Sequence, residues 1–324
     1  MINRFLNNVN KGENDWWRYL ITIVSSLGVS AFMAAFFSLF LIAIYFLFIG
    51  NSDIFAMFDY MDTYDSNIAL FFIITFIEIS FAMIFLFLSL KFIHKRDFMS
   101  IVNFSPKYDE FSGKAINWVK RVRWGQMLKG ALIWLIFMIT TLLTSFLLSP
   151  ESYSINPNME NIYLIIFLFI LAIPIQVLFE ELVFRGYLNQ GLSLKIKSPI
   201  VVILISSLIF SLLHIFNGGF NPIFMIANVF YTFILGIIFS VATLTTNGVE
   251  WATGAHFTNN LLAFLIISSE GSLGNFETII HFTDFTDPLL GLLDFLIVAL
   301  ILLILLIILF FHNKEKILNG LGIE

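Results

Sequence analysis

The sequence contains no cysteine among its 324 residues. This absence excludes disulfide bonds, thiolate metal sites and a cysteine nucleophile, although it does not indicate a compartment. Charge is also scarce, because only 12% of the residues are Asp, Glu, Lys or Arg, which is about half of what a soluble domain carries. The 7 prolines and 18 glycines are too few for a disordered or fibrous chain.

Two common hydrolase signatures are missing as well. No histidine is followed by Glu-x-x-His, so the chain lacks the zinc-binding helix of that class. There is no G-x-S-x-G sequence of the kind that carries a nucleophilic serine. The longest segment outside the apolar runs, about 94–126, is too short to form a soluble core of its own.

Long hydrophobic runs dominate what is present, with 59% hydrophobic residues overall. Runs of about 20 residues are long enough to cross the hydrocarbon layer as helices. The first run is much longer than the core of a signal peptide, so we expect it to remain as a membrane span. The sequence predicts an all-α polytopic membrane protein with about eight transmembrane helices, at roughly 19–49, 68–93, 127–148, 161–186, 199–217, 222–245, 251–269 and 288–311.

The basic residues test this span count. With eight spans, all 17 Lys and Arg residues lie in connections or ends on one side, which the positive-inside rule makes cytoplasmic. Both termini are therefore predicted to be cytoplasmic in a multi-pass protein of the cell membrane. We divide the chain into an N-terminal two-span region, 1–130, and a six-span region, 131–324. The first region ends in a basic, aromatic segment that we expect to anchor in lipid headgroups, with substrate docking as the alternative.

Charged and imidazole side chains inside membrane spans are costly, so each requires a reason. Five of the eight candidates fall in three short motifs, and we interpret the unplaced acids Glu78 and Asp294 as packing groups. The full set consists of Glu78, Glu180, Glu181, Arg185, His214, Glu250, His256 and Asp294.

The first motif is Phe179–Gly186, which contains two adjacent glutamates. Glu181 and Arg185 are four residues apart, so they share a helix face and are able to pair. Glu180 is rotated by about 100° from Glu181, and a carboxylate that points elsewhere into an apolar cavity suits a general base. The alternative is a salt-bridged helix end without catalytic function.

The other two motifs each contribute a histidine. His214 ends the sequence Phe210-Ser-Leu-Leu-His, and His256 stands four residues before Asn260 on the same helix face. An imidazole beside a carboxamide is a good donor pair for a developing oxyanion. Each of these two motifs alone is better explained by packing or by interhelical hydrogen bonds, but together with the first motif they supply a base, an imidazole partner and oxyanion donors.

The series E-E-x-x-x-R, F-x-x-x-H and H-x-x-x-N, in this order on successive apolar segments, resembles the CPBP family of CAAX prenyl protease and bacteriocin-processing (Abi) membrane peptidases. The resemblance covers about 161–267. It implies that Glu180 activates a water and that His214 helps to hold it. It further implies that His256 and Asn260 stabilise the oxyanion, with Glu181 and Arg185 as a supporting pair.

The resemblance implies an intramembrane endopeptidase, acting on membrane-associated peptides or proteins in the lipid bilayer, with no cofactor and no nucleic acid. Bacterial members are linked to bacteriocin immunity and to maturation of signalling peptides. Two alternatives stay open: a catalytically idle scaffold of the same fold, and a zinc-dependent peptidase with Glu180, His214 and His256 as ligands. A transporter would require inverted repeats, which we do not find.

One expectation conflicts with a simple depth scale. His214 lies ~22 Å from the cytoplasmic end of its predicted span, whereas Glu180 and His256 lie near the inner ends of theirs. Tilted or broken helices are therefore required, and Pro174 is expected to kink the helix that carries Glu180.

Overall fold

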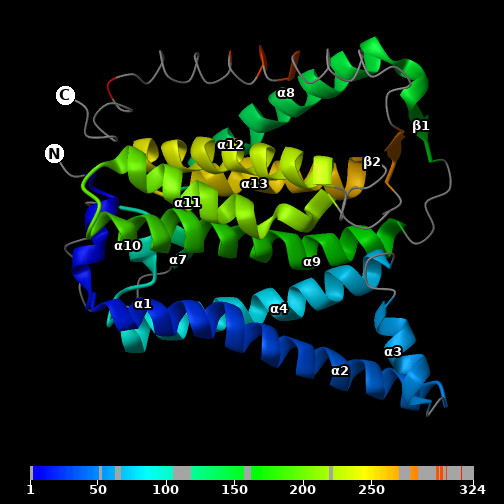
Figure 1. Cartoon of the computed structure of the whole chain (residues 1–324), viewed down its shortest axis with the longest axis horizontal. Helices are drawn as coiled ribbons and strands as arrows, with labels where there is room; N and C mark the ends of the chain where they lie inside the picture. Colours follow the sequence, from blue (N-terminus) through cyan, green and yellow to red (C-terminus); the bar gives the residue numbers. More distant parts are fainter. Residues whose placement is uncertain are drawn as a thin grey trace.

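The computed structural model of the chain describes residues 3–50, 53–62, 67–104, 118–156, 162–218, 222–269 and 278–283, with isolated residues between 297 and 315. The described residues form a bundle of long helices with one small sheet at one end (Figure 1). This confirms the prediction of an all-α polytopic membrane protein.

Five helices of the described part are long and apolar enough to cross a membrane: Trp16–Phe48, Ile68–Ile93, Trp124–Leu148, Ile162–Ser193 and Asn228–Thr246. The first is α1 (Trp16–Ile23), η2 (Val24–Val29) and α2 (Ser30–Phe48), and the second is α4 (Ile68–Leu88) and η4 (Ser89–Ile93). Then come α8 (Trp124–Leu148), the continuous α9 (Ile162–Glu181), η6 (Leu182–Leu188) and α10 (Asn189–Ser193), and α12 (Pro222–Thr246).

Two further expected spans correspond to shorter helices. These are α11 (Pro199–Leu213), which is apolar but has only 15 residues, and α13 (Glu250–Leu261) with η8 (Leu262–Ile266). The expected eighth span, 288–311, lies almost entirely outside the described residues. The number of spans and the side on which the termini lie therefore stay predictions.

Local chemistry explains where several helices begin. The side chain of Asn67 caps α4 by accepting a hydrogen bond from the backbone N–H of Leu70. Pro199 and Pro222 open α11 and α12, where a missing backbone donor costs nothing. Between α12 and α13 the chain turns at Asn247, whose positive φ of 56° suits asparagine better than most residues.

A small sheet at one end was not predicted from the sequence. Its strands are β1 (Tyr153–Ile155), β2 (Ile267–Ser269) and β3 (Ile280–Phe282), in the order β1-β3-β2. β1 runs antiparallel to β3 and β2 runs parallel to it. The strands are only three residues long, which is too short for an alternation of polar and apolar residues to reveal them.

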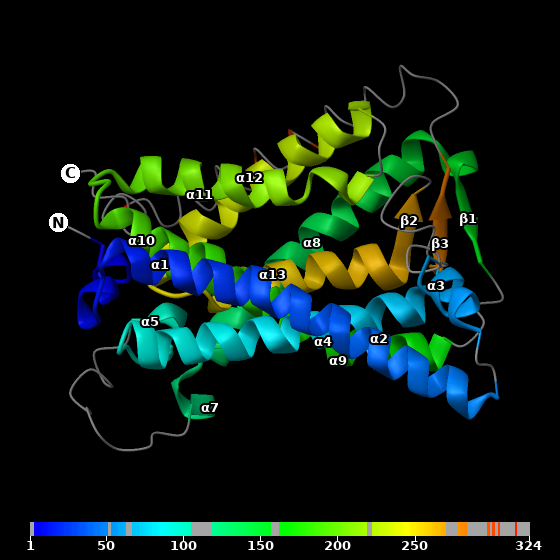
Figure 2. The same cartoon turned by 60° about the horizontal axis from the view of Figure 1, so that its bottom comes forward.

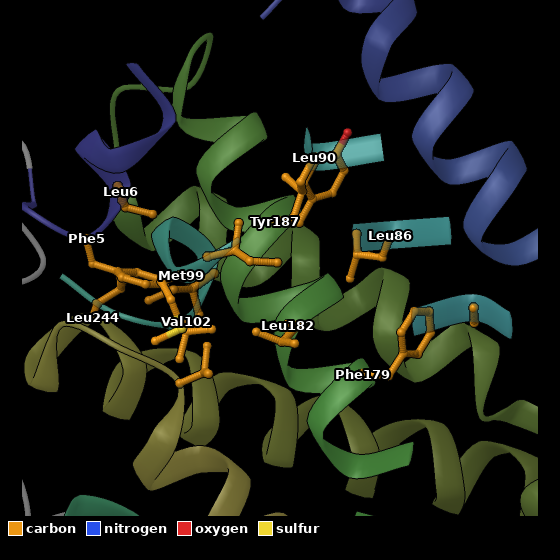
Figure 3. Close-up of a cluster of buried hydrophobic side chains, with 14 residues drawn as sticks. Phe5, Leu6, Leu86, Leu90, Met99, Val102, Phe179, Leu182, Tyr187 and Leu244 are labelled. Carbon is orange, nitrogen blue, oxygen red and sulfur yellow. The ribbon is translucent and has the colours of Figure 1, made fainter. Parts of the chain in front are cut away.

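The opposite end of the bundle is closed by the N-terminal segment. Phe5, just before the short helix η1 (Leu6–Lys11), and Leu6, its first residue, pack into a buried cluster with Leu86 of α4, Phe179 of α9 and Leu244 of α12 (Figure 3). Figures 1 and 2 show α10 and the N-terminal segment at this end, away from the sheet. The described basic connections thus gather at one end of the molecule, as the charge pattern predicts.

Much of the lateral surface is apolar, as a lipid environment requires. Large hydrophobic side chains are exposed along the helices, including Phe36 at 66%, Ile136 at 66% and Leu147 at 80%. In the most apolar window of Trp124–Leu148 only 17% of the residues are buried within the protein. Contiguous apolar exposure on this scale is not found on soluble monomers, so it supports a helix bundle surrounded by lipid.

The basic segment near residue 120 differs from the expected interfacial helix. Its described part is a single turn, α7 (Trp118–Arg121), followed directly by α8. Arg123 does not face outward, because its guanidinium forms an ion pair with the buried carboxylate of Glu250 at 2.5 Å. At least one basic residue of this segment, Arg123, therefore forms an internal ion pair and does not face lipid headgroups.

Candidate active site

Glu180 lies deeper along its helix than the sequence suggested. The predicted span ended at residue 186, but the helix continues through η6 and α10 to Ser193. Glu180 is therefore about 13 residues, or ~20 Å, from the basic end of the helix. α9 also continues through Pro174 without interruption. The longer helix thus brings Glu180 close to the depth expected for His214 without a break at the proline. His256 lies six residues after the start of α13, as the sequence suggested.

The structure brings the carboxylate of Glu180 together with both predicted histidines. Its Oε2 atom lies 3.7 Å from Nε2 of His214 and 3.7 Å from Nε2 of His256. These distances are too long for direct hydrogen bonds, and Oε2 has no hydrogen-bond partner among the described groups. Three side chains from α9, from the end of α11 and from α13 thus converge on one point inside an apolar bundle.

The second atom of each group is engaged elsewhere, which sets its orientation. Glu180 Oε1 accepts a hydrogen bond from Gln176 Nε2 at 2.5 Å. His214 Nδ1 donates to the carbonyl of Phe210 at 2.7 Å, and His256 Nδ1 donates to Glu181 Oε1 at 2.8 Å. With both Nδ1 atoms acting as donors, the Nε2 atoms are the ones left for chemistry at Glu180 Oε2.

The predicted Glu181–Arg185 pair is present and fully buried. Arg185 Nη1 lies 3.2 Å from Glu181 Oε1, and the two side chains are 1% and 0% exposed. The guanidinium also lies over the ring of Phe210, 4.2 Å from its centroid, a contact in which a cation is stabilised by an aromatic face. Glu181 therefore orients His256 while Arg185 balances its charge, and no Lys or Arg of the described residues forms an ion pair with Glu180.

Asn260 reaches the site through a neighbour. Its Nδ2 donates to Gln176 Oε1 at 3.2 Å, and its Oδ1 accepts from Asn259 at 3.4 Å. Sequence analysis did not identify Gln176. A signal was available, because Gln176 is four residues before Glu180 and is a polar residue in a strongly apolar helix.

The helix that carries His256 and Asn260 packs unusually closely against α8. A Cβ atom on Gly130 would lie 2.0 Å from the carbonyl oxygen of Trp251, and a Cβ on Gly254 would lie 1.9 Å from that of Met127. Both contacts are therefore possible only with glycine. Small residues at a membrane helix interface permit this approach of the two backbones.

The start of α13 is anchored by a buried polar cluster. Glu250, 1% exposed, accepts hydrogen bonds from Arg123 Nε at 3.0 Å and from Asn103 Nδ2 at 2.5 Å. The backbone N–H of Val249 donates to the carbonyl of Val102 at 2.9 Å. Glu250 thus has a structural partner and does not belong to the site.

The remaining intramembrane acids are not brought to the site. Glu78 lies on an exposed face of α4 and forms no hydrogen bond or ion pair with the described residues. It is therefore not the buried packing group that the sequence suggested. Asp294 lies outside the described residues. His214, by contrast, is held at the end of α11 because Asn228 of α12 donates a hydrogen bond to its carbonyl oxygen.

Comparison with known proteins shows what the segment that carries the site is similar to. Residues 161–262 match the family model described as Type II CAAX prenyl endopeptidase Rce1-like. A Bacillus subtilis (strain 168) protein, named "Uncharacterized protein YyaK", is 26% identical over 273 residues that cover 84% of each chain. No solved structure matches the chain significantly. The matched segment contains all three motifs and confirms the resemblance to the CPBP family: this multi-pass membrane protein is similar, over residues 161–262, to Rce1-like type II CAAX prenyl endopeptidases.

Proposed function

We propose that this chain is an intramembrane endopeptidase in which Glu180 activates water to hydrolyse peptide bonds of membrane-associated substrates. The family match supports a membrane endopeptidase of the CAAX type in general. The observation that carries the finer proposal is the buried Oε2 atom of Glu180, which has no hydrogen-bond partner among the described residues and lies 3.7 Å from two imidazole nitrogens.

The proposed chemistry uses the two oxygens of Glu180 differently. Oε1 is held by Gln176, and Oε2 would accept a proton from a water placed between it and His214. As the water oxygen bonds to the substrate carbonyl carbon, the carbonyl oxygen becomes an oxyanion. The same proton then passes from Glu180 to the leaving amine nitrogen as the C–N bond breaks. One residue thus serves as base and then as acid.

Stabilisation of the oxyanion falls to α13. His256, when doubly protonated, would donate from Nε2, because its Nδ1 already donates to Glu181. Asn260 has one amide hydrogen directed at Gln176 and a second that is available to substrate. Preorganised donors of this kind contribute about 10²–10³ in rate each, so both residues support a hydrolase more than a scaffold.

Access from the membrane is a direct consequence of where these groups lie. Glu180 and His214 are half-buried and His256 is buried within apolar helices, so a substrate should approach from the bilayer or from its cytoplasmic face as an amphipathic or lipid-modified segment. An extended stretch should be preferred, because helical carbonyls are already hydrogen-bonded. A role in bacteriocin immunity or signalling-peptide maturation would provide substrates of this type.

Reconstituted enzyme is expected to prefer a membrane-bound peptide over a soluble one. The probes are one quenched fluorogenic peptide in three forms: carrying a farnesylated C-terminal cysteine, carrying an N-terminal acyl chain, and unmodified. Both lipid-bearing forms should be cleaved faster than the unmodified form in vesicles, because lipidation concentrates the peptide at the bilayer. Equal cleavage of all three would contradict access through the membrane. Comparison of the first two shows whether the enzyme requires the prenyl group itself.

Removal of metal is expected to leave this cleavage intact. Among the described residues, no group of three or more His, Asp or Glu side chains is arranged to hold a metal ion. After chelation and desalting, the cleavage rate should change by less than about twofold, since Glu180 itself would generate the nucleophile without a bound metal. Loss of activity that returns with stoichiometric zinc would instead make Glu180, His214 and His256 metal ligands.

A further inference from the structure

A chain of side-chain hydrogen bonds connects four helices and ends on Glu180. Tyr231 of α12 and Trp134 of α8 donate to Asn259 Oδ1, at 3.1 Å and 3.3 Å. Asn259 then donates to Asn260, which donates to Gln176, at 3.4 Å and 3.2 Å. Gln176 completes the chain by donating to Glu180 Oε1 at 2.5 Å.

The chemistry of the two ends gives this chain one direction. An ionised carboxylate only accepts hydrogen bonds, so Gln176 must present its NH₂ group to Glu180 and its oxygen to Asn260. At the other end, the indole N–H of Trp134 only donates, so Asn259 must present its oxygen there. Each carboxamide therefore accepts on oxygen and donates from nitrogen, and no member is free to turn its amide over without losing hydrogen bonds.

The inner part of the chain is shielded from water. Trp134 is fully buried and Asn260 is 8% exposed, whereas Gln176 and Asn259 are half-buried and Tyr231 at the outer end is exposed. Water therefore competes weakly at the inner members. Hydrogen bonds in such an environment are electrostatically stronger than in water, and members of a chain polarise one another. The last bond, to a charged acceptor, belongs to the stronger class of hydrogen bonds.

We propose that Gln176 and Asn259 are positioning residues for the hydrolysis. Gln176 holds Glu180 by Oε1, which leaves Oε2 directed at His214 and His256. Asn259 fixes the rotation of the Asn260 carboxamide. Since Gln176 contacts both Glu180 and Asn260, it also sets the separation between the base and an oxyanion donor. This inference rests on the proposed function.

Gln176→Met is the main test, because methionine has a similar size and no strong hydrogen-bond group. On the acylated fluorogenic peptide, kcat should fall by about 10- to 100-fold, the value of a hydrogen bond to a charged group, while KM stays nearly unchanged. Gln176→Glu keeps an acceptor for Asn260 but, when ionised, cannot donate to Glu180. This variant should therefore be no more active than Gln176→Met. The control is Thr258→Val on α13, which removes a buried hydrogen bond to Gly254 outside the chain and should retain kcat.

Asn259→Leu provides a second route if the Gln176 variants do not fold. It should also lower kcat, and combined with Gln176→Met it should give less than the product of the two single effects, since both act through Asn260. If folded Gln176→Met has the wild-type kcat, or changes only in KM, the inference is overturned. An inactive Glu180→Ala would in that case still support the proposed function. An active Glu180→Ala would refute the proposed function itself.

Discussion

Glu180→Gln is expected to lower the cleavage rate by at least about 10³-fold, because the substitution removes the one carboxylate oxygen in the described part of the chain that lies near both imidazoles. Glutamine has the same shape, so the helix and its contact with Gln176 should persist. The measurement is single-turnover cleavage of the acylated fluorogenic peptide by enzyme reconstituted in vesicles. Substrate binding should change little, since the lost interaction develops only as water attacks.

The matched control is Glu78→Gln, which makes the same chemical change in another apolar helix. Glu78 is exposed on α4 and forms no hydrogen bond or ion pair with the described residues. Its replacement should leave the cleavage rate at the wild-type level. Retained cleavage by Glu180→Gln would exclude the general-base role, and equal losses in both variants would point to a general effect of removing an intramembrane acid.

Gly254→Ala is expected to be the most damaging single-methyl change in the bundle. The new Cβ would lie 1.9 Å from the carbonyl oxygen of Met127, which is backbone and has no rotamer to adopt. α13 and α8 must therefore separate. This should lower the free energy of unfolding by at least the roughly 1–3 kcal/mol that is usual for overpacking. Because α13 carries His256 and Asn260, a shift of about 1 Å would also lower activity by about 10²-fold.

Gly125→Ala on α8 controls for the general effect of adding a methyl group to a helix. No atom of the described residues lies within 4 Å of the Cβ that alanine would place there. Alanine should therefore leave stability unchanged or raise it by up to about 1 kcal/mol through helix propensity. Thermal unfolding in detergent and the cleavage rate are measured for both variants. A Gly254→Ala protein as stable and active as Gly125→Ala would show that the close approach of α8 and α13 is not required.

Arg123 has a different role in the fold from the one that its sequence context suggests. In the sequence it belongs to a basic, aromatic segment of the kind that binds lipid headgroups. In the structure it joins the N-terminal end of α8 to Glu250 at the start of α13. These two residues are 127 positions apart, so no local pattern could pair them. The ion pair fixes the end of the helix whose other residues enter the site.

Local periodicity was sufficient for the class of protein and for the chemistry-bearing residues. Apolar runs of helical length predicted an all-α membrane protein, because hydrocarbon forces every backbone group into internal hydrogen bonds. The four-residue spacing predicted the contact between Glu181 and Arg185, because residues four apart share a helix face. Glu180, His214 and His256 were chosen because polar groups in such helices are costly. Their catalytic roles stay predictions.

Tertiary structure alone decided how these residues meet. The depth of Glu180 depends on η6 and α10, which continue the helix through Arg185 and Gln190. The span predicted from hydropathy ended before this continuation. The participation of Gln176 depends on contact with Asn260, 84 residues away. The separation of α8 and α13 depends on glycines that face each other's backbone. Hydropathy along one helix reports how that helix partitions into lipid, whereas the geometry of the site is set by contacts between helices, which only the packed bundle contains.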